Sequence, residues 1–148
     1  MSNLKGDEVT YSLNLHSKEI QTVGKLDIEA IDKLTGIRFP ESEVKMYPGA
    51  IKHILKKHPG ILEKHGHLIP NMISNPDYIG QNPKVPDSIE LIKVINPHLL
   101  LAIKLDPTGY LFLSSFYELD NGEVKVSKRL GSGRLVPYKS TMRASEAS

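Results

Sequence analysis

The sequence predicts an α+β domain, in which helices pack on a consecutive antiparallel sheet of four to five strands, after an N-terminal β-hairpin and a short helix. Two observations predict this class. Apolar residues recur at helical spacing before residue 75, and four β-branched or apolar runs follow one another from residue 89 onward. Short turn signals separate these runs, among them Asn96-Pro97 and Asn121-Gly122, as in an antiparallel meander.

The individual elements follow from local signals. Residues 9–15 and 20–26 alternate as the two strands of a hairpin, Asp27 is suited to cap a helix, and Gly36 is suited to end it. A second helix is predicted over 48–58, because Pro48 fits a first turn and Pro59 does not fit a helix interior. Further helical turns are predicted at 59–65 and 68–74. The predicted strands are then IELIKVI, LLLAIKL, YLFLSSFYEL and EVKVSKRL, with a short final strand, RLVPY.

The composition limits the class of protein. A chain of 148 residues is most simply one domain, with residues 1–44 joined to a main part at 45–140 and a disordered tail at 141–148. The chain has no cysteine, which excludes disulfides, thiolate catalysis and cysteine zinc sites. The apolar runs are far shorter than the ~20 residues of a membrane span, and the N-terminus lacks a signal-peptide pattern. We therefore expect a cytoplasmic protein with no membrane contact.

A net charge of +2 conceals two basic segments. Residues 45–67 carry five lysines and one glutamate, and residues 121–143 carry six lysines and arginines and one glutamate. If the two segments meet in the fold, they form a positive surface that favours phosphate backbones. The alternative is that solvated lysines simply flank a helix and a hairpin.

Four of the six histidines lie between residues 53 and 67. His58 completes an apolar helical stripe and should face the strands, whereas His53 lies roughly on the opposite side of the helix. The alternatives are a buried His58 bonded to a backbone carbonyl and a solvated His53. A metal site of His58 with His65 and His67 is disfavoured by its loop spacing and its shortage of carboxylates, so no metal is predicted.

Polar side chains also interrupt the predicted strands. Alternation places Ser115 and Tyr117 on the side of Leu111 and Leu113, and Glu118 on the other side. A catalytic pair of a glutamate with a histidine is therefore not supported, and a histidine-plus-lysine arrangement is favoured.

Two lysines stand inside otherwise apolar strands. An ammonium group at Lys93 or Lys104 is costly unless it reaches water or an anion, so the two together suggest a site for a negatively charged group. Snorkelling of each lysine at a strand end is the alternative. Arg129 is predicted on the last, basic strand, beside Lys125.

An ordered series of residues between about 47 and 130 resembles a known family. The series is His53-Ile54, Lys57-His58-Pro59, Pro70, Asn75-Pro76-Asp77-Tyr78-Ile79-Gly80, Lys93, Ala102-Ile103-Lys104, Gly109-Tyr110 and Ser114 to Tyr117. It resembles the phage-associated branch of the barnase–EndoU–colicin–RelE-like (BECR) ribonuclease superfamily, with residues 1–44 and the tail outside the match. The resemblance implies helices followed by a four-stranded antiparallel sheet, and a metal-independent ribonuclease, often a toxin or prophage effector.

Cleavage of RNA without a metal needs groups that move two protons and cations that stabilise the phosphorane. The residues that resemble the family supply candidates for both tasks. We expect His58, His53, Lys93 and Ser115 to be catalytic, and Lys104, Tyr117 and Arg129 to bind the substrate. No cofactor is expected.

The sequence thus predicts an endoribonuclease of the prophage toxin or effector type. The expected substrate is tRNA or another structured RNA, the expected product end is a 2′,3′-cyclic phosphate, and the possible protein partner is a cognate antitoxin or immunity protein. One alternative is an RNA-binding module without catalysis. Another is a phage-encoded inhibitor whose basic face meets an acidic partner.

Overall fold

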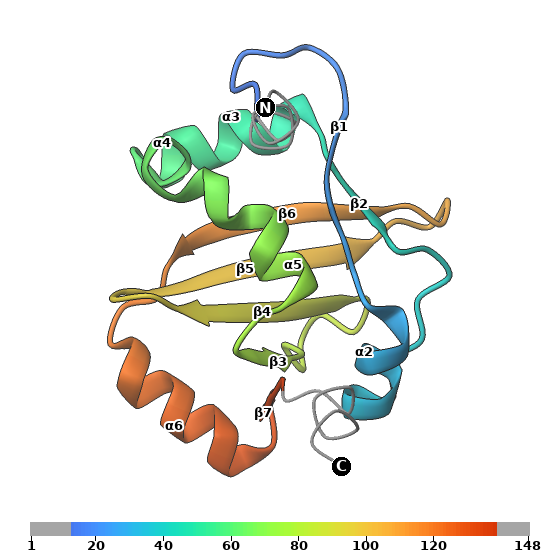
Figure 1. The fold of residues 1–148 in the computed structure, drawn as a ribbon, viewed down its shortest axis with the longest axis vertical. Coiled ribbons are helices and arrows are strands. Elements are labelled where there is room, and N and C mark those ends of the chain that lie inside the picture. Colours follow the sequence, from blue (N-terminus) through green and yellow to red (C-terminus); the bar gives the residue numbers. More distant parts are fainter. Residues whose placement is uncertain (1–12, 139–148) are drawn as a thin grey trace, which may run out of the picture.

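The computed structural model describes residues 13–138, in which seven strands form a single mixed sheet of order β1-β2-β6-β5-β4-β3-β7 (Figure 1). The strands are β1 (Gln21–Lys25), β2 (Glu43–Met46), β3 (Tyr78–Gly80), β4 (Ser88–Val94), β5 (His98–Leu105), β6 (Leu111–Glu118) and β7 (Leu135–Pro137). Neighbouring strands are antiparallel except β2 and β6, which are parallel. The α+β class is confirmed, but the sheet has more strands than the four to five predicted.

The helices are α2 (Ile28–Thr35), α3 (Pro48–Lys57), α4 (Ile61–His65), α5 (Ile69–Ser74) and α6 (Gly122–Ser132), with a 3-10 turn η1 (Gly66–Leu68) between α4 and α5. Asp27 caps α2 by accepting a hydrogen bond from the Ala30 N–H, and Gly36 ends it in the left-handed region. Pro48 occupies the first turn of α3. All the helices except α6 were predicted. None of the helices within residues 13–138 has the length and apolar character needed to cross a bilayer.

The N-terminal hairpin is paired differently from the prediction. β1 pairs with β2, for example Thr22 with Lys45, and residues 13–15 of the predicted first strand are not in a strand. Residues 13–20 form turns, and the rest of the predicted first strand lies outside the described residues, as does the tail predicted at 141–148. The Leu26 N–H donates to the Ser42 carbonyl oxygen, so the chain returns alongside β1 after the short helix α2. This return places β2 in the sheet.

The predicted strand EVKVSKRL is wrong, because this segment is the helix α6. Asn121 adopts a left-handed conformation (φ 53°) but leads into a helix and not back along a strand. Val126 and Leu130, one helical turn apart, pack against Ile92 and Leu100 of the sheet. Apolar and polar residues alternate over part of this segment, as in a strand, but Val126 and Leu130 also have the spacing of one helical turn. The local pattern therefore allows both structures, and packing of these two side chains against the sheet favours the helix.

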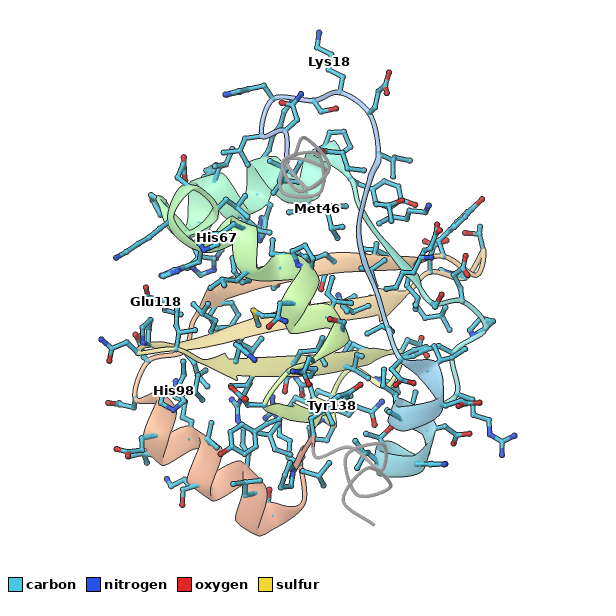
Figure 2. All side chains as sticks on the ribbon, viewed as in Figure 1. Lys18, Met46, His67, His98, Glu118 and Tyr138 are labelled. Carbon is cyan, nitrogen blue, oxygen red and sulfur yellow. The ribbon has the colours of Figure 1, made fainter. Side chains whose placement is uncertain are left out.

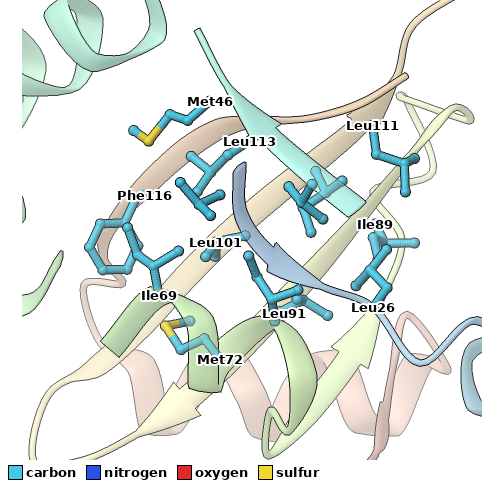
Figure 3. Close-up of a cluster of buried hydrophobic side chains, with 14 of the residues drawn as sticks. Leu26, Met46, Ile69, Met72, Ile89, Leu91, Leu101, Leu111, Leu113 and Phe116 are labelled. Carbon is cyan, nitrogen blue, oxygen red and sulfur yellow. The ribbon is translucent and has the colours of Figure 1, made fainter. Parts of the chain in front are cut away.

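The sheet has two unlike faces. One carries the main core, which β1 and the helices α3, α4 and α5 cover; Figure 3 shows Ile69 and Met72 of α5 beside Leu91. Gly24 of β1 allows the close crossing of α5, because a Cβ there would lie 2.8 Å from the Ile73 side chain. The other face carries α6 and a smaller apolar cluster, and we call it the α6 face.

A β-bulge in β6 determines which side chains reach the α6 face. Ala102 pairs with Ser115 and Ile103 pairs with Leu113, which leaves Ser114 as an extra residue. The bulge reverses the alternation, so Ser115 and Tyr117 lie on the α6 face while Leu113 stays in the main core. The prediction that they share the side of the leucines was therefore wrong, because uninterrupted alternation was assumed.

Candidate active site on the α6 face

The helix α6 covers only one end of its face. Its apolar side packs on the row formed by Ile92, Leu100 and Tyr117 on adjacent strands. The next row along the strands is Glu90–Ala102–Ser115, and the row beyond it is Ser88–Lys104–Phe112. Adjacent strands are about 5 Å apart, so Glu90 and Ser115 lie roughly 10 Å from each other with only a methyl group between them. These rows place acidic, hydroxyl and basic side chains on one surface.

Glu90 is held between two arginines. Arg134 Nε and Nη2 donate to Glu90 Oε1 at 3.2 and 3.0 Å, and Nη2 also donates to Oε2 at 3.1 Å. Arg129 Nη1 lies 4.0 Å from the same Oε1. The Glu90 side chain is only 9% exposed, so its burial depends on these cations. Two guanidinium groups against one carboxylate leave an excess positive charge at this point.

The Arg129 guanidinium can donate a further hydrogen bond. Its Nη1 is buried and has no hydrogen-bond partner among the described residues. A buried guanidinium N–H without an acceptor is unfavourable, and a phosphate oxygen is an acceptor that guanidinium groups bind well.

Tyr117 lies within electrostatic reach of this cluster. Burial raises the pKa of its phenol, the negative charge of Glu90 raises it further, and Arg129 and Arg134 oppose the rise. The hydroxyl is therefore protonated at neutral pH and is available as a donor.

His58 reaches the α6 face from α3. Helix α3 ends there because Pro59 follows, and the His58 N–H donates to the Ile54 carbonyl oxygen at 2.8 Å. β2 pairs with β6 only at Leu111 and Phe112, which leaves the second half of that strand to α3. The His58 ring stacks on the Tyr117 ring, with centroids 5.1 Å apart and planes 20° apart. The expectation that His58 faces the strands is confirmed.

The surroundings of His58 disfavour its charged form. Burial lowers the pKa of the imidazole, and the positive charges of Lys57 and His53 lower it further. The ring is therefore neutral at neutral pH and can accept a proton.

The remaining predicted residues divide between the two faces. Lys104 is exposed on the α6 face, two residues from Ala102. His53 is exposed on α3 and lines a pocket of about 400 Å³ with Phe112 and Ser114. Lys93 belongs to the opposite face, where its Nζ donates to the Asn75 carbonyl oxygen at 3.2 Å and lies 3.9 Å from Asp77 Oδ1. The structure therefore does not bring Lys93 to Ser115.

Comparison with known proteins identifies the family. The family model described as "phage-Barnase-EndoU-ColicinE5/D-RelE like nuclease3" matches residues 21–125, well over half of the chain. The chain belongs to this family. No curated protein and no solved structure matches the chain significantly. The resemblance to BECR nucleases is thus confirmed. The match also covers β1 and β2, whereas the residues that first indicated the family begin only at about residue 47.

Two charged residues of the α6 face, Glu90 and Arg134, were not among the predicted site residues. Glu90 stands between Ile89 and Leu91 in an apolar strand, a signal of the same kind as the one that singled out Lys93. Arg134 follows a glycine-rich turn and gave no signal, because only the tertiary fold brings it to Glu90. A carboxylate, that of Glu90, therefore does share the face of Ser115, although Arg134 binds both its oxygens. Glu118, as predicted, lies on the other side, 3.7 Å from His65.

In the described part of the chain, donor atoms for a metal do not gather at one place. Within residues 13–138, no three side chains of histidine, aspartate or glutamate are placed to hold one ion. His58, His65 and His67 thus do not form the metal site considered from the sequence. The α6 face instead carries the neutral imidazole of His58, the hydroxyls of Ser115 and Tyr117, two arginines and Lys104, spread over three rows of strand residues.

Proposed function

We propose that the protein is an endoribonuclease whose active site is the α6 face. The observation that carries this proposal is the stacking of the His58 ring on the Tyr117 ring. The charges of Glu90, Arg129 and Arg134 shift the pKa of the Tyr117 phenol, so these groups lie near it. A proton acceptor, a hydroxyl donor and two fixed cations thereby surround one open patch of sheet. Membership of a nuclease family supports a nucleic acid as the substrate.

The arrangement suits attack by the 2′-hydroxyl of RNA on the adjacent phosphate. Neutral His58 takes the 2′ proton, the 2′ oxygen bonds to phosphorus, and the bond to the 5′ oxygen breaks. Lys104 lies on the far side of Ser115 from His58 and gives the leaving 5′ oxygen its proton. The products are a 2′,3′-cyclic phosphate end and a 5′-hydroxyl end. RNA is required because DNA lacks the attacking group.

The other polar groups on this face stabilise the phosphate during the reaction. Arg129 offers a guanidinium N–H with no partner in the described residues, and Ser115 and Tyr117 offer hydroxyls to the non-bridging oxygens. Glu90 touches the arginines and fixes their orientation, so we assign it as a positioning residue.

The test compares His58→Ala with the wild type on RNA, with His67→Ala as the matched control because His67 is an exposed histidine of η1. Removal of a general base slows cleavage by roughly 100-fold or more. We expect this loss for His58→Ala alone, and cyclic phosphate ends on the wild-type products when RNA ends are sequenced. Unimpaired cleavage by His58→Ala, or 3′-hydroxyl ends, would sink the proposal.

A non-catalytic RNA-binding module is the second candidate, because Arg134 binds both oxygens of the Glu90 carboxylate, which leaves it poorly placed to act as a base. It predicts salt-sensitive RNA binding with no cleavage, unaffected by His58→Ala.

We further propose that the cleaved RNA is tRNA or another structured RNA, and that the protein acts as a toxin with a neutralising partner. Expression in bacteria would then arrest growth, and His58→Ala would relieve the arrest. Harmless expression of a folded wild-type protein would count against this role.

A further inference from the structure

The helix α6 presents a basic stripe on one side. Lys125, Lys128, Arg129 and Ser132 recur at i, i+3, i+4 and i+7, so they share one side of the helix. The acidic residue of this helix, Glu123, lines a different pocket with Val126. The positive charges are therefore concentrated on one side rather than scattered over the helix.

The stripe forms one wall of a groove between α2 and α6. The groove has a volume of about 820 Å³, and β3 and β7 lie between its two helices (Figure 1). Its charged lining residues within the described chain are all basic: Lys125, Lys128, Arg129 and Arg134. The opposite wall includes apolar side chains from α2 and its C-terminal end, Leu34 and Ile37, and Val136 adds to the apolar lining. Pockets of this size hold small ligands. A nucleotide suits this groove because its phosphate can bind the basic wall and its base can lie against the apolar wall.

The groove carries charge that its own residues do not neutralise. Glu90 compensates one of the four lining cations, so three positive charges remain when the groove is empty. A concave surface concentrates the field of such charges and raises the local concentration of anions. Arg129 joins the two regions, because it lines the groove and also lies beside Glu90 in the proposed active site.

We propose that this groove binds the nucleotide next to the one at the cleavage site, which rests on the proposed ribonuclease function. Its phosphate binds Lys125 and Lys128 near Arg129, and its base lies against Leu34, Ile37 and Val136. No aromatic side chain lines the groove within residues 13–138, so the base is held by apolar contact with little selectivity between bases. A base inside a duplex cannot enter a groove of this kind. The substrate class is therefore an unpaired RNA segment of several nucleotides.

The experiment compares the wild type with Lys125→Gln/Lys128→Gln on a series of RNA oligonucleotides. The control is Lys18→Gln/Lys52→Gln, which removes two lysines from another groove, and Figure 2 shows Lys18 at the end of the molecule opposite α6. For the wild type, we expect extension of a dinucleotide by two residues on each side to lower KM about tenfold or more. The groove variant should lose most of that gain with an unchanged kcat, and it should cleave the bare dinucleotide like the wild type. An equal loss in the control variant, or no gain from extension, would overturn the proposal.

A binding measurement separates this proposal from the proposed function. Binding of a labelled single-stranded RNA hexamer is followed against salt, and loss of the contact to this one phosphate should reduce the log–log slope by about 0.7. If the wild type cleaves no RNA but the groove variant shows this reduced slope, the nuclease function fails, and of the groove proposal only the binding of single-stranded RNA stands. If cleavage occurs but slope and KM are unchanged in the variant, the groove proposal fails alone. Binding of poly-glutamate in preference to RNA would also overturn it.

Discussion

At the scale of single residues, the site depends on side chains that modify one another. Glu90 can be buried because Arg134 and Arg129 surround it. Arg134 binds both carboxylate oxygens, and Arg129 Nη1 therefore has no hydrogen-bond partner among residues 13–138. Tyr117 keeps its proton because burial and Glu90 outweigh the two arginines. His58 loses its proton readily because it packs on Tyr117 and has Lys57 and His53 nearby. Tyr117 and His58 thus have the protonation states that their proposed roles require at neutral pH.

The lowered pKa of His58 predicts the acid side of the pH–rate profile. If His58 takes the 2′ proton, kcat/KM rises with pH as the imidazole loses its proton, and the midpoint of this rise lies below about 6.5, the usual histidine pKa. Stability follows in the same direction: the unfolded chain binds this proton first, so the contribution of His58 is complete above the unfolded pKa and is lost as pH falls. The measurement is kcat/KM for an RNA oligonucleotide between pH 4.5 and 8, with His67→Ala as the control variant. A rate that falls with rising pH in this range would make His58 the acid instead.

At the scale of elements, the helix α6 and the bulge of β6 build the site. The bulge places Ser115 and Tyr117 on the α6 face instead of the core face. The helix α6 brings Arg129 and the rest of the basic stripe to the same side of the sheet. The helix α6 makes a close contact with the sheet at its first residue, Gly122. Gly122 lies so near His98 that an added Cβ would be 2.5 Å from the His98 Cβ, and Figure 2 shows His98 beside this helix.

Two glycine substitutions in α6 should therefore have opposite effects on stability. Gly122→Ala forces His98 or the helix to move, and we expect a loss of about 1–3 kcal/mol in the free energy of unfolding. Gly131→Ala adds a methyl group into open space in the same helix, and we expect a gain of about 0.5–1 kcal/mol. Urea unfolding of both variants measures the difference. Equal effects would mean that α6 is not seated as described.

At the scale of the whole molecule, the N-terminal segment is an integral part of the sheet. β2 pairs with β6 in the parallel direction, and Val44 and Met46 are fully buried in the main core. β1 crosses α5 at Gly24, so the first strand is anchored to a helix distant in sequence. That residues 1–44 form one domain with the main part stays a prediction, which the unfolding of the protein can test.

This arrangement predicts cooperative unfolding. Gly24→Val places a larger side chain against Ile73 and should lower the free energy of unfolding by about 1–3 kcal/mol, whereas Thr22→Val on the exposed side of β1 should change it by less than about 0.5 kcal/mol. The chain has six tyrosines and no tryptophan, and five of the tyrosines lie from residue 47 onward. Tyrosine fluorescence thus reports mainly on the rest of the sheet. Its midpoint should shift together with the far-ultraviolet circular dichroism; a tyrosine midpoint that stays in place would show a separate N-terminal unit.

The sequence by itself determined the elements whose signals are local. Caps, first-turn prolines and apolar spacing located α2 to α5, and runs of β-branched residues located β4, β5 and β6. The same spacing turned His58 toward the strands, and the ordered residues identified the family. These features depend on neighbours within a few positions along the chain, so they can be read without the fold.

Only the tertiary structure decided what depends on contacts between distant segments. The partner of β1, the helical state of α6 and the bulge at Ser114 each satisfy packing that no local pattern encodes. The charges of Glu90 and Arg134, 44 positions apart, meet only when β4 and the segment after α6 come together. The sequence therefore supplied the chemical groups, and the long-range packing of the sheet selected which of them share one face.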